Sequence, residues 1–73
     1  MNQSSWTDIW FALPNYSRER ALLISYAWAE VAAHGDSAAL SSMQMNMLDG
    51  YAVCNQMVWI GLPVPPAARA LLV

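Results

Sequence analysis

Hydrophobic residues recur along the chain at helical spacing, and helix-capping signals divide them into segments. Ser5 and Asp8 match a capping box, in which a hydroxyl residue and an acid three positions later satisfy backbone N–H groups at a helix start. The pattern predicts a short helix over residues 5–13. Pro14 ends it, because proline disfavours the helical conformation in the residue before it.

A longer helix is predicted over residues 18–34, with Ser17 as its N-cap and Gly35 at the position where a left-handed residue is favoured. A helical wheel gives this segment two apolar surfaces separated by polar residues. The wider surface contains Ala21, Ile24, Ala27, Trp28, Val31 and Ala32. The second surface contains Leu22, Tyr26, Ala29 and Ala33. We expect Trp28 to lie inside the protein, and the second surface is then left for another contact.

A third helix is predicted over residues 38–61, because apolar and small residues recur there in steps of three and four. These residues are Leu40, Met43, Met47, Gly50, Cys54, Met57 and Gly61. Asp49 and Gly50 also form a stop signal, and a glycine inside a helix costs about 1 kcal/mol relative to alanine. A break is therefore an alternative, but the apolar stripe resumes in phase after Gly50, which favours a continuous helix.

Residues 62–73 are expected to form an extended, proline-rich arm, because each proline fixes its own φ angle and disfavours helix in the residue before it. Residues 67–72 have room for one final helical turn, with Pro66 at its first position. The arm contains the P-x-x-P spacing of polyproline ligands, but packing across the helices or across a partner subunit is the favoured interpretation.

These elements predict an all-α fold in a single domain of 73 residues. The connection between the second and third helices is short, which favours an antiparallel helical hairpin. The short N-terminal helix and the extended C-terminal arm complete the predicted architecture.

Composition indicates more apolar surface than one hairpin can bury. Hydrophobic residues make up 58% of the chain and charged residues only 11%, whereas soluble domains carry about 25% charged residues. A domain this small also buries only about 60% of the surface that its unfolded chain exposes. We therefore expect contacts with other protein, including a second copy of the chain.

Charge and cysteine content argue against several classes of protein. Arg18, Arg20 and Arg69 are too few to neutralise a phosphate backbone, so nucleic-acid binding is not expected. The single cysteine, Cys54, excludes an internal disulfide and favours a cytoplasmic setting. The N-terminal residues lack the pattern of a secretory signal, and no uninterrupted apolar stretch reaches the length of a membrane span.

No group of residues indicates catalysis. A nucleophile needs a base and an orienting group, and the pair Glu30 and His34 is instead typical of a solvated helix end. Cys54 has no basic residue one turn away to lower the pKa of its thiol, so we interpret it as a buried structural residue. We expect no enzymatic activity, no cofactor and no metal.

Aromatic and thioether side chains indicate protein binding. Tryptophan and tyrosine dominate interface hot spots, and methionine adapts to varied apolar surfaces. Met43 and Met47 share a helix face whereas Met45 points away, which favours a packing stripe over a Cu(I) site. The predicted partner-binding residues are Trp6, Trp10, Leu22, Tyr26, Met43, Met47 and Trp59.

The sequence thus predicts a non-catalytic protein-binding module that docks on a larger protein, as an inhibitor or adaptor acting by occlusion, and that associates with itself as a homodimer. An assembly or accessory subunit of a multi-protein complex is an alternative. A peripheral membrane-surface protein is a further one, with residues 6–13 in the lipid interface. It is less favoured, because Asp8 stands where such helices carry Lys or Arg.

Overall fold

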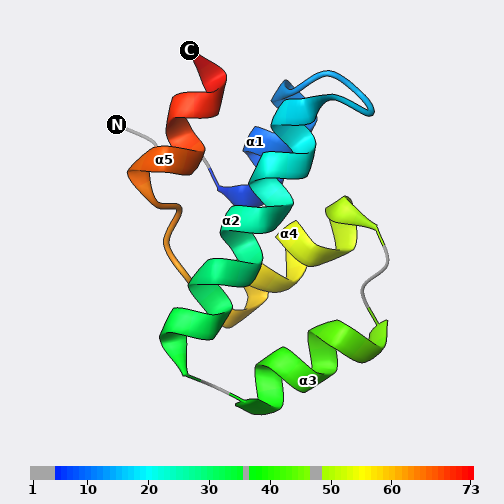
Figure 1. The fold of residues 1–73 in the computed structure, drawn as a ribbon, viewed down its shortest axis with the longest axis vertical. Helices are drawn as coiled ribbons and strands as arrows, with labels where there is room; N and C mark the ends of the chain where they lie inside the picture. Colours follow the sequence, from blue (N-terminus) through cyan, green and yellow to red (C-terminus); the bar gives the residue numbers. More distant parts are fainter. Residues whose placement is uncertain (1–4, 36, 47–48) are drawn as a thin grey trace.

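Helices account for most of the chain in the computed structural model, which describes residues 5–35, 37–46 and 49–73. In chain order they are α1 (Trp6–Ala12), α2 (Arg18–His34), α3 (Ser37–Asn46), α4 (Gly50–Ile60) and α5 (Pro66–Arg69), and a 3-10 turn (Ala70–Leu72) follows (Figure 1). No strand occurs among these described residues. The predicted all-α class is confirmed.

Side-chain caps fix the starts of the first two helices as predicted. The Oγ of Ser5 accepts a hydrogen bond from the backbone N–H of Asp8 at 3.2 Å, and the Asp8 carboxylate accepts one from the Ser5 N–H at 3.1 Å. The Oγ of Ser17 likewise accepts from the N–H of Arg20 at 3.2 Å. Gly35 ends α2 with φ 79°, a left-handed conformation that glycine adopts without steric cost.

The prediction of one continuous helix over residues 38–61 is wrong. The helix α3 ends at Asn46, and α4 begins at Gly50. Asp49 has an extended backbone, and its Oδ1 accepts a hydrogen bond from the N–H of Ala52 at 2.7 Å. Asp49 therefore acts as the N-cap of a new helix, and the stop signal prevails over the continuing apolar stripe.

A tertiary contact explains why the chain starts a new helix at this glycine. A Cβ atom at Gly50 would overlap the six-membered ring of the Trp10 indole and would come within 2.7 Å of the Cδ1 of Ile24. The α4 backbone thus lies directly against Trp10 from α1. Only a residue without a side chain permits this approach.

The helices α1 and α4 lie side by side and run antiparallel. Near the start of α1, the Nε1 of Trp6 donates a hydrogen bond to the carbonyl oxygen of Leu62, just beyond the end of α4, at 2.9 Å. Near the end of α1, the ring of Phe11 contacts that of Tyr51, with ring centroids 5.4 Å apart. The two ends of α1 are therefore held at opposite ends of α4.

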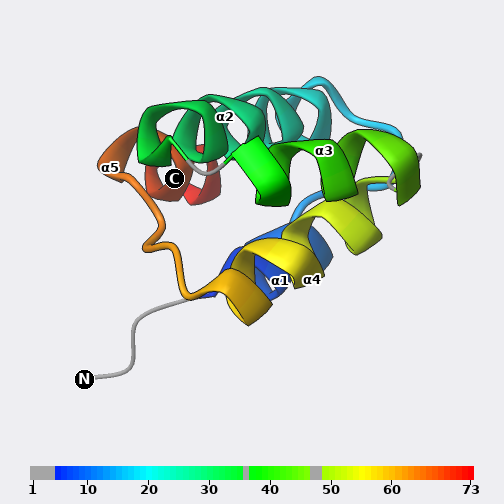
Figure 2. The same ribbon diagram turned by 90° about the horizontal axis from the view of Figure 1, so that it is seen from below.

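The helices form two layers, with α1 and α4 beneath α2, α3 and α5 (Figure 2). The helix α3 leaves the end of α2 at an oblique angle (Figure 1), and α4 makes the larger contact with α2. The predicted side-by-side hairpin of the second and third helices is not confirmed. The break before α4 accounts for this difference, because it frees α4 to pack under α2 and beside α1.

The hydrophobic core lies between the two layers and draws on four helices and two connecting segments. Its buried residues are Trp6, Ile9, Leu13, Leu23, Ala27, Val31, Val53, Cys54, Met57, Val64 and Ala68. No polar or charged side chain is buried among the described residues. The hydrogen bond from Trp6 to Leu62 satisfies the one polar group that the tryptophan carries into this core.

The buried face of α2 differs by part of a turn from the predicted one. Ala27 and Val31 are buried as predicted, but Leu23, which the wheel placed outside the wide face, is fully buried. Trp28 is partly buried and packs against the core, so it lies at its edge rather than inside. The exposed members of the predicted face are Ala21 and Ala32. The buried residues Leu23, Ala27 and Val31 are spaced four positions apart along α2, which crosses α4.

The predicted final helical turn is confirmed, and the extended part of the arm is limited to residues 62–65. Pro66 occupies the first position of α5, where its missing N–H leaves no hydrogen bond unmade. Val64 and Ala68 are buried in the core, and α5 contacts α2. The arm therefore packs across α2 of its own chain.

The contact between Gly50 and Trp10 predicts an unusual effect of substitution. Gly50→Ala should lower the free energy of unfolding by about 1–3 kcal/mol through overpacking, whereas glycine-to-alanine changes within helices usually raise it by up to about 1 kcal/mol. Urea unfolding followed by far-UV circular dichroism measures this difference. In a Trp10→Leu background, which lacks the overlapping ring, the cost should disappear. Equal stability of Gly50→Ala and the wild-type chain would contradict the contact.

Candidate functional site

The outward side of α4 carries large hydrophobic residues that the fold leaves in solvent. Tyr51 is 47% exposed, Val58 44% and Trp59 84%. At about 100° per residue, these side chains and that of Asn55 fall within one arc of about 100° on the helix. Tyr51, Val58 and Trp59 therefore lie on one side of α4, with Asn55 between them.

The surface extends onto α1 through Phe11, which is 65% exposed and packs against Tyr51. The antiparallel arrangement of α1 and α4 brings the two rings together although they are 40 positions apart in the chain. We call the surface formed by Phe11, Tyr51, Val58 and Trp59 the aromatic face. A contiguous exposed apolar patch of this kind is uncommon on a monomer and typically marks an interaction site.

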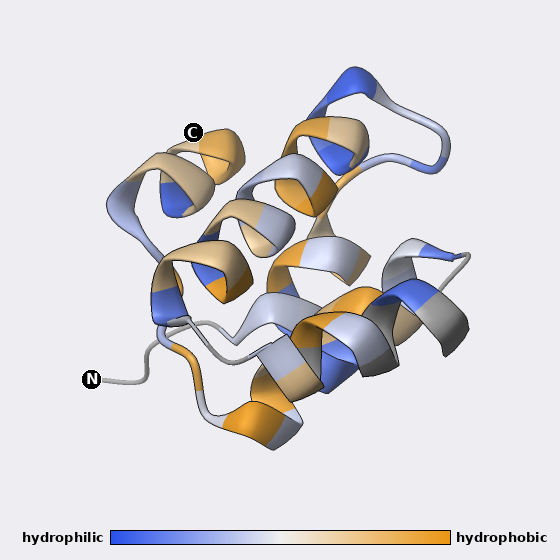
Figure 3. Ribbon diagram, turned by 60° about the horizontal axis from the view of Figure 1, so that its bottom comes forward, coloured by the Kyte–Doolittle hydropathy of each residue, from blue (hydrophilic) through white to orange (hydrophobic). Residues whose placement is uncertain are grey.

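The opposite side of α4 is also apolar, which explains why the aromatic face cannot turn inward. Val53, Cys54 and Met57 fill the core below α2 and are at most 2% exposed. Hydrophobic residues continue from the end of α4 into the segment before α5 (Figure 3). A helix that is apolar on both sides must leave one of them outside in a two-layer protein of this size.

Two predicted partner-binding tryptophans are used by the fold itself. Trp6 is 1% exposed, and its indole N–H is hydrogen-bonded within the chain, so its assignment to a partner surface is wrong. Trp10 is partly buried, with one ring face under the Arg20 guanidinium and its edge against Gly50. The one-turn spacing of the two indoles is real, but it serves the packing of α1 on α4.

The other predicted residues whose side chains the structure describes do not form one surface. Trp59 is the most exposed member of the aromatic face, whereas Leu22 is 37% exposed on α2. Tyr26 is partly buried and packs against the core. Met47 lies outside the described residues, and the side chain of Met43 does too.

Phe11, Tyr51 and Val58 were not among the residues predicted to bind a partner. A wheel restricted to residues 50–60 finds the second and third of these together with Trp59, because they are spaced by seven and eight positions. That signal was hidden by treating the segment as the second half of a longer helix. Phe11 joins the set only through the tertiary contact between α1 and α4.

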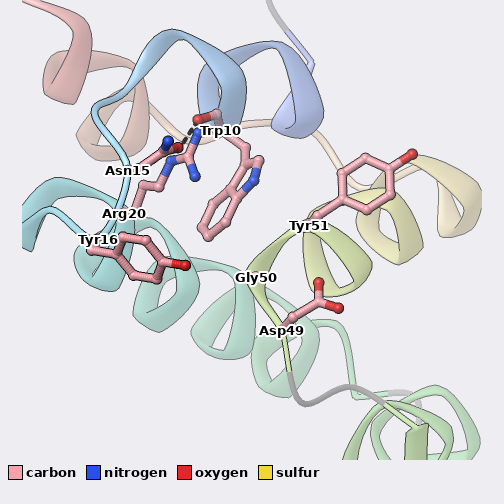
Figure 4. Close-up of a pocket in the computed structure, with 7 residues that line it drawn as sticks. All are labelled: Trp10, Asn15, Tyr16, Arg20, Asp49, Gly50 and Tyr51. Atoms are coloured by element: carbon pink, nitrogen blue, oxygen red, sulfur yellow. Dashed lines mark hydrogen bonds between the residues drawn. The ribbon is translucent and has the colours of Figure 1, made fainter.

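A pocket of about 580 Å³ opens beside the aromatic face, at the junction of α1, α2 and α4. It is lined by Trp10, Asn15, Tyr16, Arg20, Asp49, Gly50 and Tyr51. Figure 4 shows Arg20 and Tyr16 on one side of the Trp10 indole and Asp49 on the other, with the Tyr51 ring extending away from Trp10. Tyr51 thus belongs to both the pocket and the aromatic face.

Arg20 is held in a defined position inside this pocket. Its Nε donates a hydrogen bond to the carbonyl oxygen of Trp10 at 2.9 Å, and its guanidinium carbon lies 4.1 Å from the centroid of the Trp10 ring. Stacking of this kind combines cation–π attraction with packing. No carboxylate of a described residue forms an ion pair with Arg20.

Cys54 is the buried thiol that the sequence predicted. Burial raises the pKa of its thiol from 9.0 to about 12, and the positive charge of Arg20 offsets only part of this effect. A thiol that stays protonated at neutral pH is a poor nucleophile and a poor metal ligand. Cys54 therefore contributes packing to the core.

The part of the chain that the structure describes contains no cluster of three or more His, Cys, Asp or Glu side chains arranged to hold a metal ion. None of its helices combines the length and the hydropathy needed to cross a bilayer.

No protein-family model matches the chain, and neither a curated protein nor a solved structure is significantly similar to it.

The raised pKa of Cys54 predicts how stability depends on pH. Above about pH 9 the unfolded chain loses the thiol proton while the folded chain keeps it up to about pH 12, so the free energy of unfolding should fall across this interval. Urea unfolding at several pH values, for the wild-type chain and for Cys54→Ala, measures the two slopes. The variant should show the shallower slope, since it lacks the thiol whose pKa differs between the folded and unfolded states. Identical slopes would show that the thiol ionises as readily in the folded state as in the unfolded one.

Proposed function

We propose that the chain is a non-catalytic protein-binding module that docks on a larger protein through the aromatic face. The observation that carries this proposal is the exposure of Trp59 and Phe11, at 84% and 65%, on a surface that is continuous through Tyr51. Aromatic residues of this kind supply most of the binding energy at protein interfaces. Leaving them in water without a partner stabilises nothing in the fold.

The composition of the aromatic face supports the same interpretation. Between Tyr51 and Trp59 the outward arc of α4 contains one polar residue, Asn55, and no charged residue. The centre of an interface is depleted of charge and rich in aromatic side chains, whereas its rim is polar. Asp8 and Asp49 are exposed nearby on α1 and before α4, where a rim would lie.

Docking would insert Trp59 into an apolar pocket of the partner while the Phe11 and Tyr51 rings cover its edge. All three side chains are mounted on helices, so little conformational entropy is lost when they bind. Occlusion of the pocket on the partner is then the direct consequence. An inhibitor or adaptor acts in this way, and so does an accessory subunit of a larger assembly.

Self-association is a second candidate, and the outward side of α2 supports it. Leu22, Ala29 and Ala33 are exposed there, as the sequence predicted for its second apolar surface. Small side chains allow two helices to approach closely, which favours a contact between two copies of α2. Such a homodimer would leave both aromatic faces free.

The free thiol of Cys54 suits a cytoplasmic setting, where cysteines remain reduced.

A membrane-surface role has less support. Interfacial helices usually carry Lys or Arg beside their apolar residues. The exposed charge of α1 is Asp8, and the aromatic face contains no basic residue.

Two matched substitutions test the proposed function. The wild-type chain, Trp59→Asp and Leu22→Asp are each immobilised and exposed to extract of the native cells, and the retained protein is then titrated in pure form. Trp59→Asp should weaken this complex by about 2 kcal/mol or more, a factor of about thirty in Kd. Leu22→Asp should bind as the wild type does, because its side chain lies on the other layer.

Far-UV circular dichroism and sedimentation equilibrium provide the controls. Both variants should keep the helix content of the wild-type chain, since both side chains are exposed. Leu22→Asp should abolish any dimer formed through α2. Equal affinity of Trp59→Asp and the wild-type chain for the retained protein would overturn the assignment of the aromatic face.

A further inference from the structure

The pocket around Arg20 combines a fixed cation with aromatic walls. We propose that it binds a monocarboxylate that carries an aromatic or aliphatic body, at a site that adjoins the aromatic face and shares Tyr51 with it. The carboxylate would pair with Arg20, and the apolar body would lie among the rings of Trp10, Tyr16 and Tyr51.

The orientation of Arg20 supports a carboxylate ligand. The hydrogen bond from Nε to Trp10 and the stacking on the indole hold the plane of the guanidinium in place. Its two terminal nitrogens carry four further N–H donors, in the fork geometry that matches the two oxygens of a carboxylate. None of the described carboxylates occupies that fork. The fold has thus preorganised a partly buried cation without supplying its counter-ion.

The walls of the pocket favour a ligand with an apolar body. Trp10, Tyr16 and Tyr51 line it, together with the backbone of Gly50, which lies against the Trp10 ring. The volume of about 580 Å³ lies within the range of about 300–1,000 Å³ that is typical of small-molecule sites. A small inorganic anion would leave most of this space unfilled.

Tyr16 lies in the turn between α1 and α2 and combines an unusual backbone conformation with an exposed side chain at the pocket. Its φ is 58°, a left-handed value that is costly for a bulky residue, and its side chain is fully exposed. The fold therefore gains no buried area from this ring, although the backbone is strained to place it. Figure 4 shows the ring extending along the mouth of the pocket, where it would cover a ligand bound to Arg20.

Asp49 limits the charge of the ligand. Its carboxylate lines the far side of the pocket and caps α4 through the N–H of Ala52. A second negative charge on the ligand would be repelled by this carboxylate. The site therefore selects a single carboxylate, oriented with its charge toward α2 and its apolar body toward Tyr16 and Tyr51.

Phenylacetate and its neutral amide, phenylacetamide, test this proposal on the wild-type chain. Titrations at pH 7 and constant ionic strength are followed by two-dimensional ¹H–¹⁵N NMR, at the Arg20 Nε–H, the Trp10 indole N–H and the Gly50 amide. Phenylacetate should shift these signals saturably and should bind about tenfold more tightly than the amide or better, because an ion pair with two parallel N–H···O bonds replaces a hydrogen bond to a neutral oxygen. Equal affinity of acid and amide, or no saturable shift, would overturn the proposal.

Substitutions then identify which charged side chains act on the bound carboxylate. Arg20→Gln should abolish the preference for the acid, while Arg18→Gln, which removes an exposed cation from the same helix, should leave it unchanged. Asp49→Asn keeps a side chain that can cap α4 and should tighten phenylacetate binding. Equal loss in both arginine variants would indicate non-specific attraction and would overturn the site. The Trp59→Asp variant should bind phenylacetate as tightly as the wild-type chain does. A loss of protein docking in this variant can therefore be told apart from a loss of carboxylate binding.

Discussion

The contact of the Trp10 indole with the backbone of Gly50 is the constraint on which the rest of the structure depends. It sets the separation of α1 and α4 at one end, and the hydrogen bond from Trp6 to Leu62 fixes the other end. A side chain at position 50 would separate the two helices. Because α4 must start beside Trp10, the chain cannot continue as a straight helix from α3, and Asp49 caps the new start instead.

The same contact creates both candidate binding features. With α1 beside it and α2 above it, α4 can bury only one of its two apolar sides, so Tyr51, Val58 and Trp59 are left in solvent. The start of α4, with Asp49, Gly50 and Tyr51, also lines the pocket that contains Arg20 and Trp10. Tyr51 joins the two features, but they differ in chemistry. The aromatic face has no charge, whereas the pocket is organised around one.

Local signals in the sequence predicted the helix ends well, and long-range contacts account for what it missed. The caps at Ser5 and Ser17 and the stop at Gly35 involve residues within a few positions of one another, so a pattern is enough to find them. The burial of Trp6 depends on a carbonyl 56 positions away, which no local pattern contains. The break at Gly50 was visible as a stop signal, but the in-phase apolar stripe pointed the other way. The aromatic face is visible only when α4 is treated as a separate helix. It was therefore not predicted, because the break at Gly50 was not predicted.

Nuclear Overhauser effects in the wild-type chain test the central contact most directly. The account predicts cross-peaks between the Gly50 Hα protons and the Trp10 protons Hζ3 and Hη2, with the Hα signals displaced by the ring current. It also predicts the chemical shifts of an extended residue at Asp49. Helical shifts through Asp49 and Gly50, without cross-peaks to Trp10, would show one continuous helix and would contradict the account.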